Sequence, residues 1–257
     1  HQFDAHVVVS QRDAAQLHRI NPQSRIFVIE NGVDTAHYSG LPDNRKSRDV
    51  ARRVLFVGSM DYHANCDAVI DFVRNVWPLV RARLPESVFT ILGRNPSAEV
   101  RQLASIPGVE VTGTVEDVRP FYEEALAAVV PLRVGGGSRL KILEAMAAGV
   151  PVISTSLGAE GLEICAGENI LIAETPHEFC DALSKVVEDR DLNERLVANG
   201  RALVNQQYDW STLGARLAAV HQSLIRPSLA LVSPRRSSSV PASRKTIRLL
   251  AIVEATT

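Results

Sequence analysis

The chain contains the stretch Val130-Pro-Leu-Arg-Val-Gly-Gly-Gly-Ser-Arg-Leu-Lys-Ile-Leu-Glu-Ala-Met-Ala-Ala-Gly-Val-Pro-Val-Ile-Ser154, which predicts a strand, a glycine turn, a helix and a second strand. Three successive glycines at 135–137 allow the backbone to turn sharply and to approach a ligand without a Cβ in the way. The helix predicted at Ser138–Ala148 follows directly, so its free N–H groups and positive dipole end would face that ligand. The stretch therefore predicts a binding site for a phosphate group.

Charged residues near the start of this helix suit a nucleotide. Lys141 and Glu144 are three positions apart and share one helix face, so the cation could meet a diphosphate while the carboxylate accepts hydrogen bonds from a ribose. Arg139 and Lys141 are the leading phosphate ligands, with Arg133 behind them. The alternative for each cation is a solvated surface charge. At a helix N-terminus that alternative is weak, because a cation there is unfavourable unless an anion binds.

Glu144 has two interpretations. On an exposed helix it would be an ordinary surface carboxylate. The helix is apolar almost all round between Leu140 and Ala147, however, so we expect it to be buried. A buried carboxylate needs a partner, and this favours a ligand-binding role.

Elsewhere in the chain, apolar runs alternate with helical patterns. Strands are expected at Val54–Val57, Val88–Leu92, Val109–Thr112, Ala128–Pro131, Val150–Ser154 and Ile170–Ala173. Helices are expected at Cys66–Arg83, Ala98–Ala104, Val118–Ala125, Pro176–Glu188, Asp191–Gln206 and Ser211–Ile225. This alternation predicts an α/β fold with a doubly wound parallel sheet, covered by helices on both faces.

Ligands of open α/β sheets bind at the carboxyl ends of the strands, where several distinctive residues of this chain fall. The candidates that follow predicted strands are Gly58, Ser59, Gly93, Arg94 and Val115. The alternative for each glycine is that it merely ends a strand. Asn65 is a further candidate, with a plain N-cap of the helix that follows as its alternative.

Composition divides the chain into four parts. We expect residues 1–38 to be the tail of a preceding domain, 39–52 a linker, 53–225 the ligand-binding domain with its C-terminal helices, and 226–257 a disordered tail. Within that tail, residues 246–253 could form a short strand or helix. A more specific alternative is a basic arm that binds nucleic acid or a membrane, but the tail lacks the aromatic residues and the amphipathic spacing that such binding would favour.

Charge and cysteine content exclude several classes of protein. The chain has 28 Lys and Arg against 29 Asp and Glu, so no overall field would gather nucleic acid. Its three cysteines form no CxxC pair, which argues against a zinc site and a disulfide framework. No signal sequence or membrane-spanning run stands out, and a cytoplasmic location is expected.

The stretch around Glu144 resembles the signature region of GT-B glycosyltransferases of family 4, which is Glu-x7-Glu followed by Ala-Met-Ala-x-Gly-x-Pro-Val. Glu144 matches the second glutamate, whereas the first falls on Gly136. The variant Gly-Gly-Ser-Arg-Leu-Lys-Ile-Leu-Glu is similar to that of bacterial exopolysaccharide sugar transferases. Segments beginning at Asn31, Val57, Leu92 and Val111 resemble the same family in the same order.

The resemblance implies a donor-binding, Rossmann-like C-terminal domain with a remnant of the N-terminal domain. The expected donor-binding residues are Gly58, Ser59, Asn65, Gly93, Arg94, Val115, Arg133, Gly136, Gly137, Ser138, Arg139, Leu140, Lys141 and Glu144. Lys141 and Glu144 would position the donor and stabilise the transition state, and the backbone near Val115 would hold the base. No nucleophile is assigned.

The implied activity is transfer of a sugar from a nucleotide-sugar to a polysaccharide or glycolipid acceptor. It would retain the anomeric configuration, without a metal or cofactor. The saccharide or lipid-linked acceptor would bind a largely missing N-terminal domain, so the fragment alone is expected to be inactive. Peripheral association with the inner face of the membrane is a further expectation.

Rival functions fit less well. A nicotinamide-dependent dehydrogenase should carry GxGxxG after its first strand, whereas Gly58 is followed by Ser-Met-Asp-Tyr-His. A P-loop is also absent from the sequence. A non-catalytic module that binds a nucleotide-sugar, or a purely structural domain, remain as alternatives.

Overall fold

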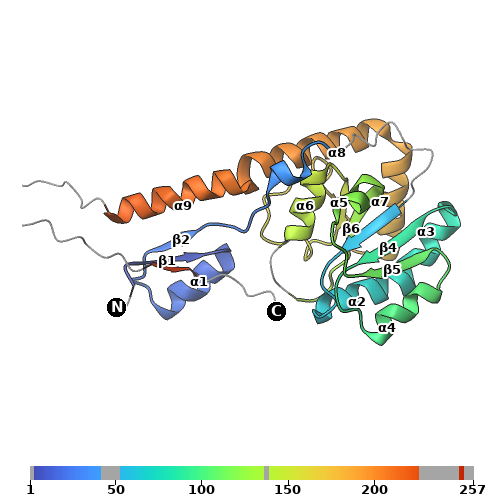
Figure 1. Cartoon of the computed structure of the whole chain (residues 1–257), viewed down its shortest axis with the longest axis horizontal. Helices are drawn as coiled ribbons and strands as arrows, with labels where there is room; N and C mark the ends of the chain where they lie inside the picture. Colours follow the sequence, from blue (N-terminus) through green and yellow to red (C-terminus); the bar gives the residue numbers. More distant parts are fainter. Residues whose placement is uncertain (1–2, 42–52, 136–138, 226–248, 252–257) are drawn as a thin grey trace, which may run out of the picture. The chain divides into compact units, whose positions relative to one another are not determined.

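The structure, a computed structural model, describes residues 3–41, 53–135, 139–225 and 249–251. It divides into two compact units. One contains the described residues up to Asn31 together with 210–225 and 249–251, and the other contains the described residues between Gly32 and Asp209. Each unit is built on its own parallel sheet, as can be followed in Figure 1.

The first unit has a three-stranded sheet in the order β2-β1-β9. Its elements are β1 (Ala5–Val8), α1 (Gln11–Ile20), β2 (Ile26–Val28), α9 (Trp210–Ile225) and β9 (Leu249–Ala251). Helix α1 begins at Gln11, because the Ser10 side chain caps it by accepting a hydrogen bond from the N–H of Asp13. Strand β9 lies in the tail that was expected to be disordered. It falls within residues 246–253, for which the sequence left a short strand or helix open, and it pairs in parallel with β1; the rest of the tail lies outside the described residues.

The second unit contains a six-stranded sheet in the order β5-β4-β3-β6-β7-β8. Its strands are β3 (Arg53–Val57), β4 (Val88–Leu92), β5 (Val109–Gly113), β6 (Ala125–Val130), β7 (Val152–Ser154) and β8 (Leu171–Ile172). All neighbouring pairs are parallel. Residues 54–56 of β3 are fully buried, as expected for a strand covered on both faces. The predicted doubly wound parallel sheet is confirmed.

The strand order reverses between β3 and β6. The chain proceeds outward from β3 through β4 to β5, and then returns to place β6 on the other side of β3. In open α/β sheets, ligands bind at the carboxyl ends of the strands at such a reversal. A ligand-binding site is therefore expected at the carboxyl ends of β3 and β6.

Helices cover both faces of this sheet. They are α2 (His63–Asp71), a π-helical turn (Phe72–Val76), α3 (Trp77–Arg83), α4 (Ala98–Gln102), α5 (Arg119–Glu123), α6 (Leu140–Ala148), α7 (Pro176–Glu188) and α8 (Arg190–Leu203). Helix α7 packs against α3 and the π-helical turn, whereas α6 packs against α5 and α8. Right-handed crossovers place α2 and α6 on opposite faces, because their connections run in opposite directions across the sheet.

An aromatic cluster packs the π-helical turn and α3 against the sheet. The ring of Phe89 on β4 lies 4.7 Å from Phe72 and 5.7 Å from Trp77. The indole N–H of Trp77 donates to the carbonyl oxygen of Pro107 at 3.2 Å. Burial of each such side chain contributes about 1.5–3 kcal/mol. This packing anchors the π-helical turn and the start of α3 on β4.

The unit boundaries differ from those expected from composition. Val33 and Tyr38 belong to the buried core of the sheet unit, although residues 1–38 were assigned to the preceding domain. Helix α9 belongs with the first unit, although it was assigned to 53–225. Burial of apolar side chains, which composition does not report, decides the placement of Val33 and Tyr38.

Candidate functional site

Helix α6 presents Lys141 and Glu144 at the reversal of the strand order. The helix begins at Leu140 and ends at Gly149, whose left-handed φ of 77° suits a glycine C-cap. Ile142, Leu143, Ala145 and Met146 are buried. Lys141 and Glu144 lie between these positions and remain partly exposed.

The Lys141 ammonium has two close neighbours. Its Nζ donates to Oδ1 of Asn65 at 2.6 Å and lies 4.6 Å from the centre of the Phe56 ring on β3. Burial, helped by the charge of Arg139 and opposed by that of Glu144, lowers the pKa of Lys141 to about 7. An anion next to this ammonium would favour its charged form.

Asn65 is not the N-cap that sequence reasoning allowed as an alternative. Helix α2 begins at His63 after the cap residue Tyr62, and the backbone N–H of Asn65 already bonds to the Tyr62 carbonyl within the first turn. The buried side-chain amide donates from Nδ2 to the carbonyl oxygen of Ser59 at 2.7 Å. Asn65 thus joins the end of β3 to Lys141.

The two candidate glycines allow close packing at the ends of β3 and β4. A Cβ on Gly58 would lie 2.9 Å from Nδ2 of Asn65 and 3.0 Å from Nζ of Lys141. A Cβ on Gly93 would overlap the carbonyl oxygen of Gly58. Neither glycine merely ends a strand, since side chains at both positions would displace the groups around Lys141.

Glu144 has the partner that a partly buried carboxylate requires. The hydroxyl of Tyr122, a fully buried residue of α5, donates to Oε2 of Glu144 at 3.4 Å. Burial raises the pKa of Glu144, while Tyr122 and the charge of Lys141 oppose this rise. The ring of Tyr38 packs edge-on against Tyr122 at 5.9 Å. Sequence reasoning missed both tyrosines, because no local pattern links them to α6.

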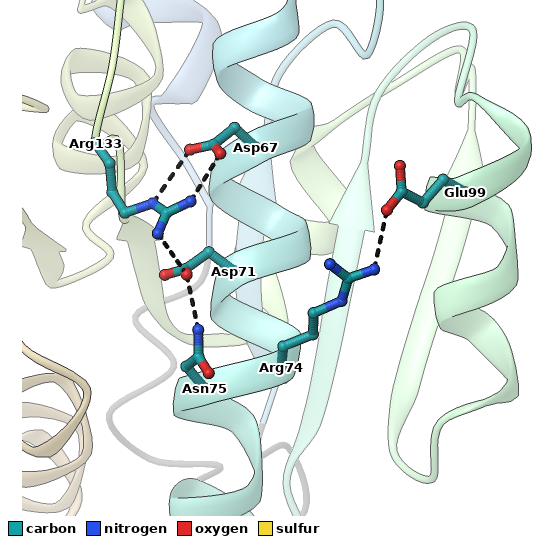
Figure 2. A network of polar contacts seen from close by, with 6 residues as sticks. All are labelled: Asp67, Asp71, Arg74, Asn75, Glu99 and Arg133. Atoms are coloured by element: carbon teal, nitrogen blue, oxygen red, sulfur yellow. Dashed lines mark hydrogen bonds and ion pairs between the residues drawn. The ribbon is translucent and has the colours of Figure 1, made fainter.

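Arg133 is engaged by carboxylates of α2, as Figure 2 shows. Its Nε and Nη2 donate to the two oxygens of Asp67 at 3.2 and 2.7 Å, and Nη1 donates to Asp71 at 2.6 Å. Asn75 also donates to Asp71, at 2.8 Å. Two carboxylates thus surround one guanidinium. This arrangement argues against the predicted role of Arg133 as a phosphate ligand, because its charge is already compensated.

Gly135 follows in the same loop with a left-handed φ of 94°. A Cβ there would lie 2.5 Å from the Tyr62 hydroxyl. The loop therefore packs closely on the start of α2 at Gly135. Gly136, Gly137 and Ser138 lie outside the described residues.

Arg139 also has a protein partner. Its side chain is buried, and it donates to the backbone carbonyl of Glu160 at 3.3 Å and to the Glu160 carboxylate at 3.4 Å. The unfavourable cation at the start of α6 is therefore compensated by a carboxylate from the loop after β7. A bound anion is not needed to explain Arg139.

Arg94 and Ser59 meet beyond the ends of β4 and β3. Nε of Arg94 donates to Oγ of Ser59 at 3.0 Å and lies 3.2 Å from the Asp61 carboxylate. Asn95 donates to the same carboxylate at 3.0 Å, which is the main cause of a lowered pKa for Asp61. This exposed cluster borders Gly58, so it adjoins the Lys141 site.

The remaining candidates lie at the edge of this arrangement. Val115 and Leu140 are partly buried and pack against the core. Within the described ranges, no group of three or more His, Cys, Asp and Glu side chains could hold a metal ion. No helix among the described residues is long and apolar enough to cross a membrane.

The parallel sheet has glycines directly after β3 and β4, and a lysine and a glutamate of α6 at the strand reversal. These features are typical of open α/β domains that bind ligands at the carboxyl ends of their strands. The model of the family described as "Glycosyl transferases group 1" matches residues 51–189, more than half of the chain. The chain therefore belongs to the group 1 glycosyltransferases.

Known relatives and structures agree with this family. The chain is 27% identical over 202 residues to the phosphatidyl-myo-inositol mannosyltransferase of Mycobacterium leprae, covering 76% of this chain and 53% of that protein. It is 34% identical over 157 residues to the GDP-mannose-dependent alpha-(1-6)-phosphatidylinositol monomannoside mannosyltransferase of Mycobacterium tuberculosis, covering 55% of this chain and 40% of that protein. The fold is similar to that of HepE from Anabaena in complex with UDP and glucose, with a TM-score of 0.67, 17% identity and coverage of 86% and 63%. The chain spans about half the length of the curated relatives it matches.

Proposed function

We propose that this chain is the donor-binding half of a glycosyltransferase that takes a sugar from a nucleotide-sugar. The observation that carries the proposal is the Lys141 ammonium, held at the strand reversal 2.6 Å from the neutral Asn65 amide. Unlike Arg133 and Arg139, Lys141 donates to a neutral acceptor, so its charge stays available to an anion. The family membership and the GDP-mannose dependence named for one relative support a nucleotide-sugar as the source of that anion.

In the proposed complex, Lys141 contacts the diphosphate and Glu144 accepts hydrogen bonds from the ribose. The bond between the sugar carbon and the diphosphate oxygen breaks, and Lys141 stabilises the charge that develops on the leaving group. A hydroxyl oxygen of the acceptor bonds to the same face of the sugar carbon, and its proton passes to the departing phosphate oxygen. The anomeric configuration is retained, and cationic side chains neutralise the diphosphate without a metal or cofactor.

The acceptor is proposed to be a polysaccharide or a glycolipid. Two relatives are named as enzymes that mannosylate phosphatidylinositol lipids or their mannosides, and a third is encoded in a cps region. The acceptor site would lie in the half of such proteins that the chain does not span. Sugar transfer to a lipid-linked acceptor would place the protein in the cytoplasm at the inner face of the membrane.

Calorimetric titration of the chain with UDP, GDP and ADP tests this proposal. We expect saturable binding of one nucleotide, weakened by about tenfold or more in Lys141→Ala and in Glu144→Ala. The matched controls are Lys185→Ala and Glu188→Ala, which change exposed residues of α7. Failure of the folded chain to bind any of the three nucleotides would contradict the proposal.

A second measurement separates an enzyme from a binding module. Transfer from the nucleotide-sugar that binds is assayed with a longer protein that includes the region covered by the relatives but not by this chain. Release of nucleotide that depends on an acceptor supports a transferase. Tight donor binding with no release in that longer protein would favour the non-catalytic module.

A further inference from the structure

The side chain of Asn65 has only one orientation that suits both of its partners. Its Nδ2 donates to the Ser59 carbonyl oxygen at 2.7 Å, and its Oδ1 accepts from Nζ of Lys141 at 2.6 Å. A flipped amide would place an acceptor against the Ser59 carbonyl and a donor against the ammonium. Asn65 is also buried, at 6% exposure, so water cannot readily replace either contact. Its oxygen is therefore fixed beside Lys141.

The space for this contact exists because residue 58 has no side chain. A Cβ on Gly58 would lie within 2.9–3.0 Å of both Nδ2 of Asn65 and Nζ of Lys141. The Phe56 ring supports the ammonium from β3 at 4.6 Å, an arrangement that favours the charged form. Three elements, β3, α2 and α6, thus converge on one nitrogen atom.

The partner of Lys141 differs in kind from those of its neighbours. Arg133 is held by two carboxylates and Arg139 by one, which compensate their charges. Asn65 holds Lys141 through a neutral oxygen, which orients the ammonium without cancelling its charge. The charged groups that act on Lys141 are Arg139 and Glu144, with opposite effects. A neutral amide is therefore a better partner than a carboxylate for a cation that must still attract an anion.

We infer that Asn65 is a positioning residue, which fixes the Lys141 ammonium at the ends of β3 and β6 so that it meets the diphosphate of a donor. This inference rests on the proposed function for the identity of the anion. The contact between Asn65 and Lys141 can be tested without any nucleotide.

The first test follows the titration of Lys141 by NMR, with lysine labelled at the ε-carbon in the whole chain. The sequence contains four lysines, Lys46, Lys141, Lys185 and Lys245, and Lys141→Arg assigns the signal. Asn65→Asp is nearly isosteric and places a carboxylate beside the ammonium. We expect the apparent pKa of Lys141 to rise by about one unit or more, and the signal of Lys185 on α7 serves as the internal control. An unchanged Lys141 titration would overturn the inference.

The second test is a double-mutant cycle on the nucleotide that binds. Asn65→Ala should weaken binding about tenfold in the natural background, because it removes a hydrogen bond to a charged group. In a Lys141→Ala background the same change should cost less than about twofold, since the residue through which Asn65 acts is gone. Equal losses in both backgrounds would show that Asn65 acts independently of Lys141.

The two tests fail in different ways. If no nucleotide binds, the proposed function is contradicted, whereas the NMR titration still decides whether Asn65 holds Lys141. If nucleotide binds but the apparent pKa of Lys141 is the same in Asn65→Asp as in the natural protein, only the positioning role of Asn65 is overturned. Asn65→Asp should also weaken nucleotide binding, because its carboxylate holds the ammonium in place but compensates its charge. Undiminished nucleotide affinity in Asn65→Asp would show that the neutral charge of the Asn65 side chain is not important for binding.

Discussion

The carbonyl oxygen of Gly58 occupies the space that a Cβ on Gly93 would need. The two residues end neighbouring strands, and the N–H of Gly58 bonds to the carbonyl of Leu92 at 2.9 Å. Because Gly58 also borders Asn65 and Lys141, the close approach of β3 and β4 helps to shape the candidate site.

We expect Gly93→Ala to destabilise the sheet unit by about 1–3 kcal/mol, because the added methyl group must displace backbone. Urea denaturation measures this change in the free energy of unfolding. The matched control is Gly214→Ala on α9, where an added Cβ meets nothing within 4 Å. Equal stability of Gly93→Ala and the natural protein would show that the two strand ends separate easily.

Nucleotide binding should take up a proton near pH 8. The pKa of Lys141 in the free protein is lowered to about 7, so the side chain is mostly neutral at pH 8. A bound diphosphate favours the ammonium and raises that pKa. Affinity should therefore be highest below about pH 7, where Lys141 is already charged, and fall by up to about tenfold per pH unit above it. Calorimetry in buffers of different ionisation enthalpy measures the proton uptake directly.

Lys141→Arg provides the control for this proton uptake. A guanidinium stays charged throughout the range, so its binding should vary little between pH 7 and 9. The same pH dependence in Lys141→Arg as in the natural protein would assign the proton to another group.

Arg133 should matter little for the charge of the site. Its ion pairs with Asp67 and Asp71 compensate the guanidinium and are largely solvent-exposed. We expect Arg133→Gln to change nucleotide affinity by less than about threefold, and stability by about 0–1 kcal/mol. Lys141→Gln should weaken binding by about tenfold or more. Comparable losses of affinity in the two variants would restore Arg133 as a phosphate ligand.

Glu144 should make binding depend on the ribose hydroxyls. The natural chain is expected to prefer the nucleoside diphosphate over its 2′,3′-dideoxy analogue by about tenfold, since a carboxylate forms strong hydrogen bonds to a diol. Glu144→Ala should bind both compounds with nearly equal affinity, whereas Glu188→Ala should keep the preference. Competition titrations measure the ratio of the two affinities, and an undiminished preference in Glu144→Ala would exclude Glu144 as the ribose ligand.

Much of the fold was predictable from the chain because its signals are local. Helix α7 at 176–188 and strand β4 at 88–92 have the predicted bounds, since capping and apolar runs act over a few residues. Helix α2 starts earlier than predicted, at His63, because the sequence before Asn65 carries no distinctive cap. Lys141 and Glu144 were likewise visible as a pair of charges three positions apart within one stretch.

The partners of the charged side chains were decided by tertiary structure. Sequence separations of 66 and 76 residues divide Arg133 from Asp67 and Lys141 from Asn65, and no local pattern spans such distances. These contacts form because β6 returns to lie beside β3, which brings α2, α6 and the loop after β6 to one end of the sheet. The sequence by itself therefore determined which residues could carry charge to the site. Only the packing of the sheet decided that Arg133 and Arg139 are compensated by carboxylates, while Lys141 is held by a neutral amide.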